Sequence, residues 1–312
     1  ICSHTHTHTD SNLEIPISPI ALFPSNRYAL CQKERGGAAE LCGLGAALTY
    51  AKEYAAIKYY ALALDKSREN GDLRWEAQAL CGMGLSASVS GHTEEMRQYY
   101  SKSLEPLQKI DDKLSQYEVL STLVKSYSGD PKHFVEIYER LITVAKALNK
   151  PVLMADALKI AADSHGLLRN NGKALYLYHQ CLIYLDPKTE QGRTAQVYRK
   201  MGDTYAARGD REFAIEHYNK SAELFKAIED YGQVIDTLKA VALLYHGLDY
   251  QKTLKYFLQA LEYAVTCQDL RRQAEIMADI SSFERAAGNH LEAARWSENS
   301  LKAYEQMQDK TG

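Results

Sequence analysis

The sequence lacks the patterns that mark membrane proteins and the common classes of enzyme. No run of about 18 apolar residues occurs, so we expect no segment to span a bilayer. A serine in a G-x-S-x-G turn and an H-E-x-x-H zinc motif are both missing, and the carboxylates are spread along the chain. The sequence therefore predicts no catalytic residues and no metal site, and we expect a protein that is not an enzyme.

An excess of charge of one sign is also missing. The 37 Lys and Arg residues nearly balance the 40 Asp and Glu residues, and the formal net charge is −3. A strong nucleic-acid binder would need a basic footprint, so nucleic acid is not an expected partner. Hydrophobic residues make up 46% of the 312 positions, which is typical of an ordered protein and excludes a disordered chain.

The six cysteines include no C-x-x-C pair. Four of them lie in apolar stretches with helical patterning, where cysteine behaves as a small buried hydrophobe. These four are Cys42, Cys81, Cys181 and Cys267. Free cysteines of this kind are typical of a reducing compartment, so we expect the protein to be cytoplasmic.

The first 35 residues differ in composition from the rest of the chain. Residues 1–35 hold three of the seven prolines, which prevent a continuous helix. His and Thr alternate from His4 to Thr9, and we interpret this stretch as a low-complexity tail rather than a metal chelate. We expect an irregular, partly disordered N-terminal segment. Because the chain starts at Ile1 and its first methionine is Met83, we also expect a fragment or a processed product.

Aromatic residues recur at a nearly constant spacing through the rest of the chain. The first six follow one another at intervals of 40, 38, 40, 40 and 39 residues, and a seventh continues the series. They are Tyr60, Tyr100, Tyr138, Tyr178, Tyr218, Phe257 and Trp296. Short polar turns divide each period into two helical segments. Two helices joined by so short a turn pack antiparallel, so the pattern predicts a series of helix hairpins.

The fifth period carries a set of small and aromatic residues at fixed positions. They are Met201, Gly202, Tyr205, Gly209, Ala214 and Tyr218. This pattern resembles the tetratricopeptide repeat (TPR) family. The period of about 40 residues exceeds the usual length of 34. The longer form is similar to the repeats of kinesin light chain, LGN-type adaptors, rapsyn and SH3-plus-TPR proteins.

The resemblance implies an all-α fold, an α-α superhelix or TPR solenoid of about seven antiparallel helix hairpins. One hairpin alone buries too little apolar surface to fold, so the hairpins must stack. We expect the array to cover 36–312. Its units are expected near 36–70, 71–110, 111–149, 150–188, 189–229, 230–268 and 269–308.

Two glycine pairs resemble the start of a dinucleotide-binding motif. Gly43 with Gly45 and Gly82 with Gly84 lie at the same phase of the repeat, but neither pair follows a candidate strand. We therefore interpret them as positions where helices pack closely, and we expect no cofactor. At the position equivalent to Gly45 and Gly84, the third, sixth and seventh units carry Thr122, Val241 and Ser281 instead of glycine.

In the family that the sequence resembles, the first helices of the repeats line a concave groove that binds extended or helical peptides. Projecting this geometry onto the sequence gives ten candidate groove residues. They are Lys159, Asp163, Arg199, Lys200, Asp203, Lys239, Tyr245, His246, Leu123 and Tyr127. Most are polar, and their charges are of both signs. Mixed charges favour directional recognition of a peptide over nonspecific binding of phosphate.

The predicted function is therefore that of a noncatalytic protein–protein interaction scaffold or adaptor. Its partner would be a peptide or helix that lies in the concave groove. The alternative is that the chain is the regulatory TPR region of a larger multidomain protein and docks an effector domain intramolecularly. The sequence indicates neither the identity of the partner nor whether the chain associates with itself.

Overall fold

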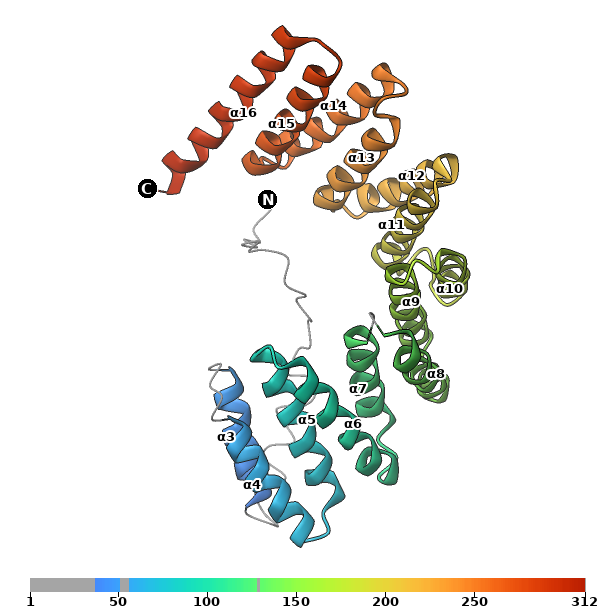
Figure 1. Cartoon of the computed structure of the whole chain (residues 1–312), viewed down its shortest axis with the longest axis vertical. Helices are drawn as coiled ribbons and strands as arrows, with labels where there is room; N and C mark the ends of the chain where they lie inside the picture. Colours follow the sequence, from blue (N-terminus) through green and yellow to red (C-terminus); the bar gives the residue numbers. More distant parts are fainter. Residues whose placement is uncertain (1–36, 51–55, 128–129, 312) are drawn as a thin grey trace. The chain divides into compact units, whose positions relative to one another are not determined.

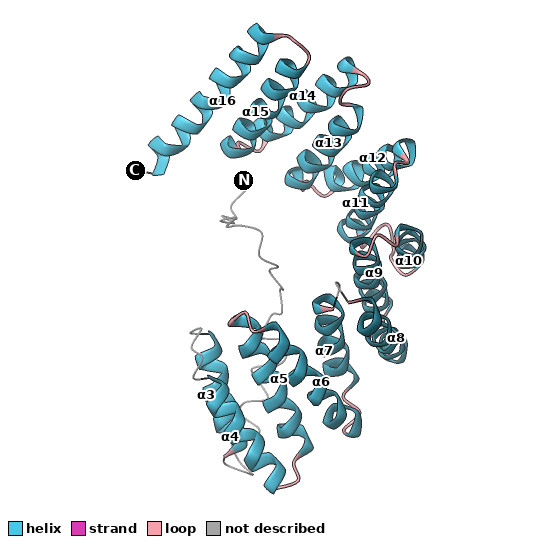
Figure 2. Cartoon of the chain, in the orientation of Figure 1, coloured by secondary structure: helices cyan, strands magenta, loops and turns pink. Residues whose placement is uncertain are grey.

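The computed structural model describes residues 37–50, 56–127 and 130–311. These residues form 14 helices and no strand (Figure 2). The expected all-α class is confirmed. The irregular segment expected over 1–35 lies outside the described residues.

The chain divides into two compact units between Leu168 and Arg169, and each unit is described by itself. The N-terminal unit contains seven of the described helices. They are α3 (Ala38–Tyr50), α4 (Ala56–Glu69), α5 (Leu73–Val89), α6 (Thr93–Lys109), α7 (Lys113–Ser126), α8 (Pro131–Leu148) and α9 (Pro151–Leu167). Neighbouring helices in the chain pack as the hairpins α3–α4, α5–α6 and α7–α8.

The C-terminal unit contains the other seven described helices. They are α10 (Asn171–Ile183), α11 (Gln191–Arg208), α12 (Arg211–Ala227), α13 (Tyr231–Tyr245), α14 (Tyr250–Thr266), α15 (Leu270–Ala286) and α16 (His290–Thr311). Three hairpins, α11–α12, α13–α14 and α15–α16, follow one another along this unit (Figure 1). The helices of the fourth expected hairpin, α9 and α10, belong to different units.

The turns between hairpins contain a residue in the left-handed backbone region. It is a non-glycine residue at Asp111, Asn149, Glu229 and Gln268, with φ between 49° and 59°. At three of these turns the next residue is an aspartate that caps the following helix, as Asp230 does by accepting a hydrogen bond from the backbone N–H of Gln233. The polar turns seen in the sequence therefore end one helix and start the next.

The recurring aromatic residues pack against small residues of the preceding helix. A Cβ atom added to Gly202 of α11 would lie 2.6 Å from the ring of Tyr218 in α12, and one added to Gly84 would lie 2.8 Å from Tyr100. Tyr60 of α4 also contacts the following helix, because a Cβ atom added to Gly82 of α5 would lie 2.2 Å from its ring. These contacts confirm that Gly82, Gly84 and Gly202 are close-packing positions.

The last hairpin replaces this contact with a hydrogen bond. The hydroxyl groups of Ser281 in α15 and Ser297 in α16 are 2.7 Å apart, and Ser281 also donates to the carbonyl of Ala293 at 2.8 Å. Ser297 thus takes the position that an aromatic residue holds in the earlier hairpins. Trp296 packs beside it, against the apolar core of the C-terminal unit.

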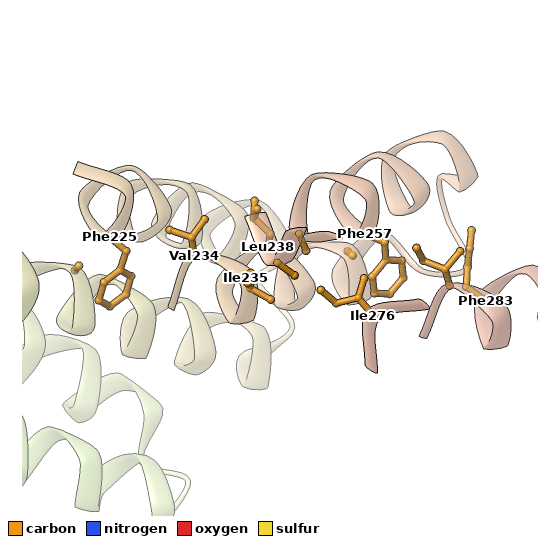
Figure 3. Close-up of a cluster of buried hydrophobic side chains, with 12 residues drawn as sticks. Phe225, Val234, Ile235, Leu238, Phe257, Ile276 and Phe283 are labelled. Carbon is orange, nitrogen blue, oxygen red and sulfur yellow. The ribbon is translucent and has the colours of Figure 1, made fainter. Parts of the chain in front are cut away.

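Stacked hairpins share that core. Its buried members come from consecutive helices from α11 to α15, and Figure 3 shows seven of them labelled along one continuous row. They are Phe225, Val234, Ile235, Leu238, Phe257, Ile276 and Phe283. Because each hairpin completes the core of its neighbour, the unit is stabilised as a stack.

Candidate functional site

A row of charged side chains connects the first helices of the three C-terminal hairpins. Arg199 of α11 donates from Nη1 to Gln233 Oε1 of α13 at 2.6 Å and lies 4.0 Å from Asp236 Oδ2. Arg272 of α15 donates from Nη1 to the other carboxylate oxygen of Asp236 at 3.2 Å. Asp236 therefore lies between two arginines from two different hairpins. We call Arg199, Asp236 and Arg272 the charge ladder.

A second ion pair runs beside the ladder. Lys239 Nζ of α13 lies 2.7 Å from Asp279 Oδ2 of α15. On α11, Lys200 Nζ lies 3.9 Å from Asp203 Oδ2. These contacts extend along α11, α13 and α15, the first helices of the three hairpins. We call the side of these helices that carries them the first-helix face, and its charges alternate in sign.

Asp203 is positioned by one of the recurring aromatic residues. The hydroxyl of Tyr218 donates to Asp203 Oδ1 at 2.7 Å, while the ring of Tyr218 packs on Gly202. Burial, together with the negative charge and hydrogen bond of Asp203, raises the pKa of Tyr218. The tyrosine therefore stays protonated and holds the carboxylate in a fixed orientation.

An apolar side chain lies on the same side of α13 as two of these charges. Asp236, Lys239 and Leu243 follow one another on α13 at spacings of three and four residues, which places them on one side of the helix. Leu243 is exposed on this side. The face therefore combines charges of both signs with an apolar contact point.

Tyr245 and His246 lie at the C-terminal end of α13 and contact neighbouring helices. The ring of Tyr245 stacks on Tyr256 of α14 at a centroid distance of 5.8 Å, and Lys252 Nζ lies 4.9 Å from the ring of Tyr245. The ring of His246 lies 5.5 Å from that of Phe283 in an edge-on arrangement. Both predicted residues thus belong to the C-terminal unit, where Tyr245 packs against α14 and His246 packs against α15.

Four predicted residues lie in the N-terminal unit instead. Lys159 and Asp163 form an ion pair of 3.4 Å on α9. The ring of Tyr127 stacks on His133 at 5.5 Å and lies 4.3 Å from the Arg97 guanidinium, so Tyr127 joins α6, α7 and α8. Leu123 is buried in the core of this unit. That burial corrects the expectation for Leu123, because its side chain points away from any surface that a peptide could reach.

The sequence-based prediction missed several residues of the C-terminal face. They include Gln233, Leu243, Asp236 and Arg272, of which the last two form most of the charge ladder. The steps from Arg199 to Asp236 and from Asp236 to Arg272 are 37 and 36 residues, about one helical turn less than the repeat. Opposite charges at this shortened spacing were the signal in the sequence that could have identified the ladder.

The described residues contain no group of three or more His, Cys, Asp and Glu side chains that could hold a metal ion. None of the described helices combines the length and the apolar character needed to cross a bilayer.

Removing the central carboxylate of the ladder is expected to weaken the C-terminal unit. We expect Asp236→Ala to lower its free energy of unfolding by about 1 kcal/mol, because two arginines lose their shared partner. The loss should shrink in about 1 M salt, which screens the ion pairs. Urea unfolding at two salt concentrations measures both effects. The control is Glu216→Ala, which removes an ion pair within α12 alone and should cost at most about 0.5 kcal/mol. Equal losses in the two variants would contradict a role in joining hairpins.

Residues 193–264, which extend from α11 into α14, match the family model described as tetratricopeptide repeat. A comparison with curated proteins gives no match. The matched segment contains Arg199, Asp236 and Lys239, so it includes much of the candidate face. This segment therefore matches the TPR family that the sequence resembles, and solved structures of similar fold include TPR-type repeat proteins.

Several solved structures are similar to the chain. A signal-transduction ATPase with a tetratricopeptide repeat sensor from Pyrococcus horikoshii is 13% identical, over 94% of this chain and 46% of its own, with a TM-score of 0.66. BtubC (BKLC) from P. vanneervenii is 16% identical over 69% of this chain and 92% of its own, with a TM-score of 0.57. A Rap protein complexed with competence and sporulation factor is 13% identical over 94% and 93%, with a TM-score of 0.51. These similarities show the fold, which is typical of noncatalytic protein–protein interaction scaffolds.

Proposed function

We propose that the protein is a noncatalytic scaffold or adaptor that binds a partner peptide or helix in a concave groove formed by the first helices of its repeats. The observation that carries this proposal is the first-helix face of the C-terminal unit. On this face, α11, α13 and α15 contribute charges of both signs, and the exposed side chain of Leu243 lies one turn beyond Lys239 on α13. Charged groups give a partner its register and orientation, while an apolar contact contributes to affinity.

The fold supports the same function. A Rap protein of similar fold has been solved in complex with competence and sporulation factor, so this architecture is compatible with ligand binding. For this chain the ligand would be a peptide with charges of both signs and an apolar side chain between them. Such a peptide would exchange ion pairs with the face and cover Leu243.

We also propose a cytoplasmic location. Burial raises the pKa of both Cys42 and Cys81 to about 12, so both side chains are thiols at neutral pH. Protonated buried thiols react slowly and behave as apolar core residues. The four cysteines of the described residues are free, which suits a reducing compartment.

Reversing one exposed charge tests the binding face. The probe is a fluorescent peptide selected against the full chain from a random displayed library, and its affinity is measured by anisotropy. We expect Lys200→Glu to weaken binding about tenfold, because Lys200 is exposed on α11 and its side chain makes only a 3.9 Å ion contact. The matched control is Lys220→Glu on the second helix α12, since the Lys200 and Lys220 side chains are 49% and 47% exposed. Equal affinities for the two variants would contradict binding on the first-helix face.

A charge exchange separates recognition from stability. The double variant Lys239→Asp with Asp279→Lys keeps an ion pair between α13 and α15 but reverses its direction. The melting temperature should therefore stay close to that of the parent, whereas the selected peptide should bind more weakly. Unchanged affinity in the exchanged variant would argue that the peptide does not read these charges.

A further inference from the structure

Two charged side chains lie on one side of α7, the first helix of the hairpin α7–α8. Glu118 and Lys125 are seven residues apart, which is two helical turns, so about 10 Å separates them along the helix axis. Glu118 is half-buried and Lys125 is exposed. Leu114, one turn before Glu118, is 44% exposed on the same side. A ligand that lies along α7 can therefore reach both charges.

Neither of the two charges is paired. Within the residues that the structure describes, no hydrogen bond or ion pair reaches the carboxylate of Glu118 or the ammonium group of Lys125. The hydroxyl groups of Ser121 and Thr122 donate to the backbone carbonyl of Glu118 and leave its carboxylate free. The two side chains do not pair with each other, because side chains on a helix meet at spacings of three or four residues.

The surroundings of both groups disfavour their charges. Burial, together with the negative charge of Asp112, raises the pKa of Glu118. Burial and the positive charge of Lys159 lower the pKa of Lys125, and two aspartates of α9 oppose this shift. A partly desolvated charge without a counter-ion costs free energy, so a ligand that supplies the counter-ion removes this cost.

A paired carboxylate and ammonium group in the other unit show the opposite behaviour. Glu216 and Lys220 of α12 form an ion pair, which lowers the pKa of Glu216 and raises that of Lys220. Both shifts favour the charged forms. Glu118 and Lys125 lack this stabilisation, so each has an unused capacity to bind a group of opposite charge.

The signs and the separation of the two charges define a class of ligand. A nucleic acid presents charge of one sign along its backbone, so it would pair with Lys125 and be repelled by Glu118. The two charges of a single amino acid lie on the same α-carbon, too close together to span about 10 Å. A peptide can present side chains of both signs at this distance.

We propose that this side of α7 binds an extended peptide segment with a basic and an acidic side chain about 10 Å apart. The basic side chain pairs with Glu118, and the acidic one pairs with Lys125. In a polyproline II segment, residues three apart lie on the same side and are about 9 Å apart, which matches the two charges. The inference rests on the proposed function, because it assigns a ligand class to the first helix of one further repeat.

Titrating the full chain with a short proline-rich peptide tests the proposal. The probe carries Arg and Glu three residues apart, and NMR of the isotopically labelled chain follows the backbone amides of α7. We expect these amides to shift with a dissociation constant on the order of 10⁻³ M, because partly exposed ion pairs contribute little free energy. A peptide with Glu at both positions should bind at least about threefold more weakly. Amides of α7 that do not shift, or equal affinities for the two peptides, would overturn the proposal.

Reversing the exposed charge tests which group binds the acidic side chain. We expect Lys125→Glu to weaken binding of the Arg–Glu peptide at least about threefold, and a peptide with Arg at both positions should bind this variant with restored affinity. The matched control is Lys146→Glu, because Lys146 is also exposed but lies on α8, the second helix of the same hairpin. If the two variants bind the Arg–Glu peptide equally well, Lys125 is not its partner and the assignment is wrong.

Neutralising the half-buried charge separates binding from stability. Glu118→Gln should weaken peptide binding at least about threefold, while its melting temperature stays equal to that of the parent or rises, because no unpaired charge is then desolvated. A lower melting temperature with unchanged binding would show a purely structural role for Glu118 and contradict the proposal. These measurements concern α7 alone, so their failure is distinguishable from failure of the Lys200→Glu test on the C-terminal unit.

Discussion

Phe225→Ala should lower the free energy of unfolding of the C-terminal unit by about 3–5 kcal/mol. Phe225 is almost fully buried and packs with Val234 and Ile235 of the next hairpin. Removing its ring leaves a cavity at the contact between two hairpins and loses the burial of a large apolar group. Since each hairpin completes the core of its neighbour, we expect the whole unit to unfold at a lower denaturant concentration.

Tryptophan fluorescence can follow each unit separately. The sequence contains two tryptophans, and Trp75 lies in the N-terminal unit while Trp296 packs on the C-terminal core. In a Trp75→Phe background, the remaining signal from Trp296 reports the unit that contains Phe225. The control is Phe213→Ala, because Phe213 lies on the same helix but is exposed, and it should cost less than about 1 kcal/mol. Similar losses for the two phenylalanines would show that the contact between hairpins is not what stabilises the unit.

The repeat made the fold predictable from the sequence. A period near 40 residues, polar turns and close-packing glycines each depend on local chemistry that a single sequence displays. Gly202 and Tyr218 illustrate this, because the absence of a side chain at one position is explained by the ring at the other. The series of aromatic residues was less informative in the last hairpin, where Ser281 and Ser297 replace a steric contact with a hydrogen bond.

The candidate site was less predictable because it depends on the offset between neighbouring helices. Lys239 and Asp279 are one repeat apart, and Lys239 was predicted as a groove residue. Arg199, Asp236 and Arg272 meet at a shorter spacing, which follows from how the helices are staggered. That stagger is set by the packing of the core, so a fixed repeat length does not reveal it.

The orientation of single residues on a helix was also hard to predict. Leu123 fits the periodicity of a first helix as well as an exposed residue would, but its side chain packs inward. The helical pattern of α7 is apolar on more than one side, so the sequence left the exposed side undefined. The single array expected over 36–312 remains a prediction, since the structure describes two compact units.

The other large effect concerns Gly82 in the N-terminal unit, where we expect Gly82→Ala to destabilise the protein although alanine favours helices. A Cβ atom on Gly82 would lie 2.2 Å from Cε1 of Tyr60, whose side chain is fully buried. The ring has no room to retreat, because a Cβ atom on Gly45 would already lie 2.9 Å from it. We expect a net loss of about 1–3 kcal/mol from overpacking, after a gain of up to about 1 kcal/mol in helix propensity.

A second glycine of the same unit gives the matched control. Gly166 lies within α9, and a Cβ atom on it would meet no other atom within 4 Å. Gly166→Ala should therefore raise the free energy of unfolding by about 0.5–1 kcal/mol, so the two identical substitutions should act with opposite sign. Trp75 fluorescence in a Trp296→Phe background measures both.

Tyr60→Leu added to Gly82→Ala should cost less than the sum of the two single losses, because the clash disappears with the ring. Additive losses would mean that the ring is not the obstacle and that the recurring glycines serve something other than close packing.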